Sequence, residues 1–176
     1  GEVLWNMTGQ HSVANALATI AAAEHVGVSI TTACEALSNF GGVKRRMELL
    51  GRVRGIEVYD DFAHHPTAID TTLEGARKRL GERKLWAIIE PRSNTMRMGS
   101  HKDGLAHSAR LADEVIWYQP EGLDWDMQPV IDAAPNKAKV ARTLDDIIQT
   151  VVAEAGEGDA VVIMSNGGFG GLHQKL

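Results

Sequence analysis

Apolar runs alternate with helical patterns along most of this chain, and this alternation constrains the fold more than any other feature. The runs at 85–89 and 160–164 are apolar at every position, as in strands buried on both faces of a sheet. Further strands are predicted at 56–59, 114–118 and 140–143, and helices at 66–80, around 105–112, and at 144–155. This order predicts an α/β fold: a mostly parallel sheet with helices on both faces.

Two helices are predicted before this pattern begins. The first covers 11–24 with Ser12 as its N-cap, and the second is short and starts at Thr32 with capping-box spacing. Neither has a partner elsewhere in the chain. Gly41 and Gly42 follow, and they form a natural joint because glycine is unfavourable inside helices and strands.

The segment 58–67 joins a strand to a helix through a polar turn. Its short apolar start runs into Asp60 and Asp61, then His64 and His65, and Pro66 suits the first position of a helix. Loops at the carboxyl ends of parallel strands face a ligand-binding crevice, so this segment is a candidate site. The alternative is that the aspartates are ordinary solvated turn residues.

Three predicted strands end in loops rich in functional groups. These loops start at Asp60, Arg92 and Asn166. Right-handed crossovers bring the carboxyl ends of parallel strands to one edge of the sheet, so the three loops are expected to converge there. This convergence predicts a binding cleft without naming its ligand.

The groups in these loops suit a nucleotide and an anionic substrate. Asp61 could accept hydrogen bonds from a ribose diol, and His64 could lie against a base or a phosphate. No further Cys or His has the spacing of a zinc site, so no metal ligands are assigned.

Two segments that carry arginines could each bind an anionic ligand or could simply lie on the solvated surface. The cluster 43–46, which ends in Arg45 and Arg46, could clamp a phosphate or could be solvated. Arg92 and Arg97 flank Ser93 and Asn94 in an arrangement suited to gripping carboxylates, or they are surface arginines.

The glycine-rich segment 166–171 contains Asn166, Gly167 and Phe169. Its glycines would let the backbone approach a ligand closely, although a flexible loop has the same composition. It matches neither the dinucleotide fingerprint nor the phosphate loop. No Ser-His-Asp or Cys-His nucleophile is evident, so an ATP-using enzyme would need parts beyond this chain.

Composition excludes several classes of function. The 18 basic residues form no long stripe and the net charge is −5, which argues against nucleic-acid binding. No apolar run approaches the roughly 20 residues that a membrane span needs. One cysteine, Cys34, fits a reducing cytosol, so a cytoplasmic location is expected. The chain starts at Gly1 rather than Met, so we expect a fragment of a longer protein.

Three separated motifs resemble the carboxy-terminal part of the Mur ligases. They are DDFAHHPT at 60–67, EPRSNTM at 90–96 and MSNGGFGGLHQKL at 164–176, in the order in which the family has them. The second and third are more similar to the branch that joins the tripeptide L-Ala-γ-D-Glu-meso-diaminopimelate to UDP-N-acetylmuramate in peptidoglycan recycling than to the branch that adds L-alanine.

The resemblance implies an ATP-dependent amide ligase with magnesium as cofactor. Residues 1–42 would be the last helices of a central ATPase domain, and 43–176 a Rossmann-like carboxy-terminal domain that closes over the nucleotide about the glycine joint. This fragment alone would be inactive. The alternatives are a lobe of the L-alanine ligase, a non-catalytic nucleotide-binding module and a redox domain of flavodoxin type.

The resemblance also implies roles for individual residues. His11 and Asn15 match a motif near the adenine, in which Ser12 replaces an Asn of the family. Arg46 would reach the ATP phosphates, Asp61 would hold the ribose, and His64 would lie near the nucleotide and the reaction centre, which makes Arg46 and His64 the catalytic candidates. The incoming peptide would meet Arg92, Ser93, Asn94, Arg97, Asn166, Gly167 and Phe169.

Overall fold

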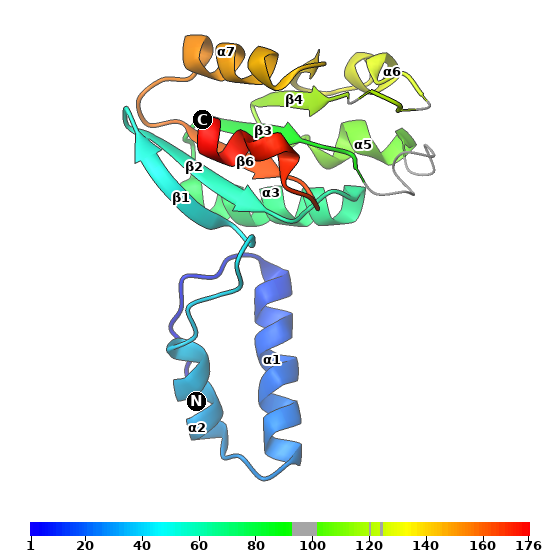
Figure 1. The fold of residues 1–176 in the computed structure, drawn as a ribbon. Coiled ribbons are helices and arrows are strands. Elements are labelled where there is room, and N and C mark those ends of the chain that lie inside the picture. The colour runs from blue at the N-terminus through cyan, green and yellow to red at the C-terminus, as the bar shows by residue number, and fades with distance from the viewer. Residues whose placement is uncertain (93–101, 120, 124) are drawn as a thin grey trace. The chain divides into compact units, whose positions relative to one another are not determined.

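The structure is a computed structural model, and it describes residues 1–92, 102–119, 121–123 and 125–176. The chain divides into two compact units, Gly1–Lys44 and Arg45–Leu176 (Figure 1). Helices α1 (Gln10–His25) and α2 (Ile30–Ser38) make up the first unit. No helix in the described part of the chain is long and apolar enough to cross a membrane.

Both predicted helix caps in the first unit are wrong. Helix α1 begins one residue earlier than expected, after Gly9, so Ser12 lies inside its first turn, where the buried hydroxyl donates to the Thr8 carbonyl at 2.8 Å. The N-cap of α2 is Ser29, whose hydroxyl accepts from the Thr32 backbone N–H at 3.1 Å. A serine or threonine can either cap the amino terminus of a helix or lie within its first turn, and the sequence alone does not distinguish the two positions.

The first unit exposes much of its apolar surface. On α1, Val13 is 50% and Leu17 63% exposed, and Ile30 at the start of α2 is 44% exposed. Two helices with such faces do not form a closed core. The assignment of this unit to a central ATPase domain stays a prediction.

The second unit is built on a six-stranded sheet of the described residues in the order β1-β2-β6-β3-β4-β5. The strands are β1 (Glu48–Val53), β2 (Ile56–Asp61), β3 (Leu85–Ile89), β4 (Glu114–Tyr118), β5 (Lys137–Ala141) and β6 (Ala160–Met164). All neighbours pair in parallel except β1 and β2, which form an antiparallel hairpin. The predicted mostly parallel sheet is confirmed.

Helices cover both faces of the sheet, as predicted (Figure 1). One buried cluster packs α3 (Pro66–Leu80), α5 (Lys102–Ser108) and α6 (Gln128–Asp132) on the sheet. The other packs α7 (Leu144–Glu154), the short turn η1 (Phe169–Gly171) and α8 (Leu172–Lys175). Strands β3 and β6 are buried at every position because they lie between the two clusters.

Element bounds agree with the predictions best where periodicity is strong. Strands β3, β4 and β6 and helix α3 have the predicted bounds. Strand β2 continues through Asp60 and Asp61, which were expected in a turn. Strand β5 starts three residues early, at Lys137, and α5 ends at Ser108, before Ala109 and Ala112. Strand β1 was not predicted, since its side chains are half-exposed.

At the end of the sheet where the parallel strands begin, which we call the amino-terminal edge, Glu57 is a buried carboxylate held by two arginines. It is 4% exposed and accepts hydrogen bonds from Arg52, Arg83 and the Tyr59 hydroxyl. Burial by itself raises the pKa of Glu57, but these hydrogen bonds outweigh it and lower that pKa from 4.5 to about 2. The carboxylate therefore stabilises the fold in its charged form.

We expect Glu57→Gln to lower the free energy of unfolding by about 3 kcal/mol at pH 7. Because the folded-state pKa lies below the ordinary value of 4.5, this stabilisation is complete above that pH and is lost as the pH falls toward about 2. Urea unfolding at several pH values, followed by tryptophan fluorescence, measures the difference. Glu82→Gln, at an exposed carboxylate, is the control. A difference that persists unchanged down to pH 2 would contradict this account.

Candidate active-site edge of the sheet

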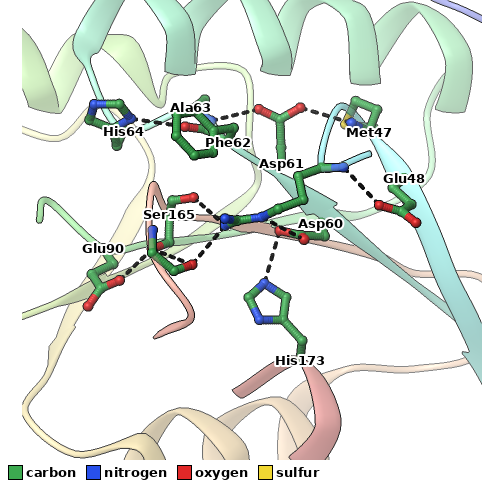
Figure 2. Close-up of polar contacts among 12 residues, drawn as sticks. Met47, Glu48, Asp60, Asp61, Phe62, Ala63, His64, Glu90, Ser165 and His173 are labelled. Atoms are coloured by element: carbon green, nitrogen blue, oxygen red, sulfur yellow. Dashed lines mark hydrogen bonds and ion pairs between the residues drawn. The ribbon is translucent and has the colours of Figure 1, made fainter. Parts of the chain in front are cut away.

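The carboxyl ends of three neighbouring strands meet at one edge of the sheet, as the loop pattern predicted (Figure 2). The Ser165 N–H donates to the Asp61 carbonyl at 3.1 Å, which ties the loop after β6 to the end of β2. The Glu90 N–H donates to the Met164 carbonyl at 2.9 Å, which ties β3 to β6. Loops that are far apart in sequence thus form one surface.

Asp60 and Arg45 form the central ion pair of this edge. The Arg45 Nε lies 3.1 Å from Asp60 Oδ2, and Arg45 Nη2 donates to the carbonyls of Ser165 and Gly167 at 2.6 and 2.8 Å. The other oxygen of Asp60 lies 3.0 Å from His173 Nε2. Asp60 is 7% exposed, so its charge is compensated within the protein.

Asp61 builds the turn that follows β2. Its Oδ1 accepts from the Ala63 N–H at 2.8 Å and from the Thr72 hydroxyl at 3.1 Å, and its Oδ2 accepts from the Met47 N–H at 2.9 Å. The side chain is buried, with 3% exposed. Of the roughly four acceptor positions of a carboxylate, about one remains for a ligand. Asp61 therefore has a structural role in holding this turn, and its contact with a ribose stays a prediction.

Phe62 presents an aromatic ring between two cations and an imidazole. It is 36% exposed, and the guanidinium carbons of Arg45 and Arg46 lie 5.2 and 5.5 Å from its centroid. The His64 ring meets it edge-on at 5.7 Å. His64 Nδ1 lies 2.9 Å from the Phe62 carbonyl and donates to it, which leaves Nε2 as the ring nitrogen available to a ligand. Arg46 is itself exposed.

Ser165 joins the ends of β6 and β3. Its buried hydroxyl donates to Glu90 Oε2 and accepts from the Gly167 N–H at 2.9 Å. Gly167 permits a close approach, because a Cβ atom there would collide with the Arg92 guanidinium. The neighbouring Asn166 Oδ1 is buried and accepts no hydrogen bond from the described residues.

A cleft of about 250 Å³ opens beside this junction. It is lined by Glu90, Arg92, Tyr118, Glu121, Leu144, Phe169 and Gly170. Burial raises the pKa of the Tyr118 hydroxyl, and the charges of Glu90 and Glu121 raise it further. The lining thus combines acidic groups with one guanidinium, which matches a ligand that carries both charges.

The structure brings together only part of the predicted site. Arg46, Asp61 and His64 share the turn around Phe62, and Arg92 and Gly167 touch at the cleft, where Phe169 forms part of the buried wall. His11 and Asn15 lie exposed on α1 in the first unit. Ser93, Asn94 and Arg97 lie outside the described residues.

The sequence prediction passed over several residues of this edge. Asp60 was included in the candidate segment 58–67 but given no role of its own, and Arg45 was noted only as a member of the basic cluster. Glu90, Tyr118, Glu121 and His173 were assigned no role. Position was a signal for Glu90, Tyr118 and Asp60, which stand at or just after the carboxyl ends of predicted strands. Glu90 and His173 also belong to two of the three motifs.

Comparison with known proteins identifies the family. The family described as Mur ligase, glutamate ligase domain, matches residues 45–167. The chain belongs to the Mur ligases. It is 48% identical over 176 residues to the UDP-N-acetylmuramate–L-alanyl-γ-D-glutamyl-meso-2,6-diaminoheptanedioate ligase of Haemophilus influenzae, covering 99% of this chain and 39% of that relative. The chain therefore spans about two fifths of the length of this curated relative.

Other Mur ligases are also similar. The crystal structure of a murein peptide ligase from Psychrobacter arcticus shares 59% sequence identity and a TM-score of 0.79, over 99% of this chain and 38% of that one. A UDP-N-acetylmuramate–L-alanine ligase from Saccharopolyspora erythraea is 39% identical over 121 residues, which is 69% of this chain and 24% of that relative. The likeness to the tripeptide ligases is thus higher and extends over more of the chain.

We expect Asp61→Asn to lower the free energy of unfolding by about 1–3 kcal/mol, because an amide nitrogen would replace an oxygen that accepts backbone hydrogen bonds. Thr72→Val removes only one of the three donors and should cost less. Chemical denaturation without nucleotide measures both. If Asp61 served a ribose alone, Asp61→Asn would be as stable as the wild type.

Proposed function

We propose that this chain is the carboxy-terminal part of an ATP-dependent ligase that joins L-Ala-γ-D-Glu-meso-diaminopimelate to UDP-N-acetylmuramate. The observation that carries the proposal is the 48% identity, over 99% of the chain, to a relative whose name states this tripeptide. The convergent edge of the sheet supports it, because it supplies cationic groups and a mixed-charge cleft side by side. Its setting would be peptidoglycan recycling in the cytoplasm.

The reaction forms an amide in two steps. The γ-phosphoryl group of ATP is transferred to the muramoyl carboxylate, and ADP leaves. The amine of the tripeptide then attacks the acyl carbon, phosphate departs, and the amine loses a proton. Such catalysis depends on positioning the reactants and on neutralising charge that develops in the transition state.

The turn around Phe62 would serve the nucleotide. Arg46 is exposed and its described contact is the face of Phe62, so its guanidinium can reach a phosphate without breaking an internal ion pair. His64 offers its free ring nitrogen close by. Asp61 would contact the ribose through its remaining acceptor position, and His11 and Asn15 would lie toward the adenine.

The cleft would serve the peptide. Arg92 suits a carboxylate of the tripeptide, and Glu90 and Glu121 suit an ammonium group. Asn166 has a buried oxygen for which the described residues offer no donor, which an N–H of the peptide could supply. Gly167 and Phe169 shape the wall. Ser93, Asn94 and Arg97 would add contacts from the segment that follows Arg92.

Magnesium would screen the phosphates of ATP. No group of three or more His, Cys, Asp or Glu in the described ranges could hold a metal ion. As the family resemblance implies, magnesium would be held mostly by parts of the enzyme outside this chain, with Arg46 as a cationic group that approaches the same phosphates.

The first test compares two amines in the intact enzyme. With ATP, magnesium and UDP-N-acetylmuramate, we expect phosphate release with the tripeptide to exceed release with L-alanine by at least about 100-fold, since the mixed-charge cleft matches the longer substrate. Release driven only by L-alanine would assign the chain to the alternative branch. Absence of ATP-dependent release with either amine would overturn the ligase proposal itself.

A second test concerns Arg46. We expect Arg46→Ala in the intact enzyme to lower kcat about 100-fold, because it removes a charge that stabilises the transferring phosphoryl group. Stability should change by less than about 0.5 kcal/mol, since the side chain is exposed. Arg79→Ala is a matched control, because Arg79 is likewise exposed and packs on an aromatic ring, that of Tyr59 at 5.2 Å. Equal kcat values for the two variants would refute the role of Arg46.

A further inference from the structure

Two adjacent arginines of the basic cluster have different surroundings. Arg46 is exposed, whereas the side chain of Arg45 is only 29% exposed and makes three polar contacts with groups of the sheet edge. A guanidinium whose Nε and Nη2 are already engaged by protein oxygens is poorly placed to bind a phosphate through the same donors. Arg45 therefore has a task other than that of its neighbour.

The backbone on either side of Arg46 is held in an uncommon conformation. Arg45 has φ 60° and Met47 has φ 49°, both in the left-handed region that residues other than glycine rarely adopt. Each such residue costs about 1 kcal/mol or more and persists only where the surroundings impose it. The turn that presents Arg46 is thus maintained by its contacts.

Three backbone hydrogen bonds fix this turn. The Arg45 N–H donates to Glu48 Oε2 at 2.8 Å, and the Met47 N–H donates to Asp61 Oδ2 at 2.9 Å. The Arg45 carbonyl accepts from the Phe62 N–H at 2.8 Å. The backbone on both sides of Arg46 is therefore held by bonds to β1, to the last residue of β2 and to the residue after it.

The Arg45 side chain extends from this turn to the loop after β6. Its Nε pairs with Asp60, and its Nη2 donates to the carbonyls of Ser165 and Gly167. Asp60 is held in turn by His173 from α8. One guanidinium thus connects the turn of Arg46 to the loop that carries Asn166, with fixed directions that a planar fork imposes.

We propose that Arg45 is a positioning residue that holds the turn of Arg46 and the 165–167 loop in register. This inference rests on the proposed function, in which the first segment meets the nucleotide and the second meets the amine. The acyl phosphate and the attacking amine must approach closely, and a displacement of about 1 Å can cost about 100-fold in rate. Arg45 acts through the two segments and touches neither substrate.

The test uses Arg45→Gly in the intact ligase, with Arg54→Gly as the matched control. Arg45 has φ 60° and Arg54 has φ 53°, so glycine relieves the backbone strain equally at both sites. Arg54 lies in the β1–β2 turn, at the opposite end of β2. We expect Arg45→Gly to lower kcat/KM for the tripeptide about 100-fold, and Arg54→Gly to leave it unchanged. Added guanidinium at millimolar concentration should restore several-fold of the loss in Arg45→Gly.

Three results would overturn the inference. They are equal kinetics for the two glycine variants, a loss in Arg45→Gly that guanidinium does not reverse, and wild-type kinetics for Arg45→Lys. A lysine cannot contact Asp60 and both carbonyls at once, so kcat/KM of Arg45→Lys should remain at least tenfold below the wild-type value. If Arg45→Gly does not fold, this variant tests the inference in its place. A wild-type enzyme without ligase activity would refute the proposed function instead, independently of these comparisons.

Discussion

Parallel pairing of β2, β6 and β3 is the constraint on which the rest of the structure depends. It brings three strand ends, with the polar residues that follow them, to one edge of the sheet. The buried apolar faces of β3 and β6 fix this arrangement, because both helical layers pack on them. The site therefore derives its rigidity from the core beneath it.

Charges at the two ends of the sheet have different tasks. At the amino-terminal edge, Glu57 pairs with Arg52 and Arg83, which satisfies a buried carboxylate and stabilises the fold. At the carboxyl-terminal edge, Asp60 pairs with Arg45, while Arg46 remains exposed and the cleft keeps acidic groups beside Arg92. Charged side chains that are kept available to a ligand cannot also be fully paired within the protein, and such incomplete pairing is expected at a functional site.

Much of this arrangement could be predicted from sequence, for physical reasons. Strands β3 and β6 are apolar at every position and bounded by polar turns, so their existence and limits followed from pattern. Convergence of the loops at Asp60, Arg92 and Asn166 followed from the geometry of parallel sheets. The edge strand β1 could not be predicted, because Leu49 and Leu50 are both exposed and the strand therefore has no alternating apolar pattern.

The different surroundings of Arg45 and Arg46 could not be predicted. They depend on a left-handed backbone at residue 45 and on carbonyl groups 120 and 122 residues further along the chain. Likewise, Asp61 looked like a ligand-binding carboxylate, and its internal hydrogen bonds with Met47 and Thr72 became visible only in the fold. Local patterns identify residue types, whereas long-range contacts decide which of them remain available to a ligand.

The proposed function requires the nucleotide and the amine to meet at this one edge of the sheet. A crystal structure of the intact ligase with a non-hydrolysable ATP analogue, magnesium and the tripeptide tests it most directly. Our account predicts the phosphates near Arg46 and His64, the peptide against Arg92 and Glu90, and Arg45 still paired with Asp60. A nucleotide or a peptide bound away from this edge, or a phosphate held by Arg45 in place of Asp60, would contradict it.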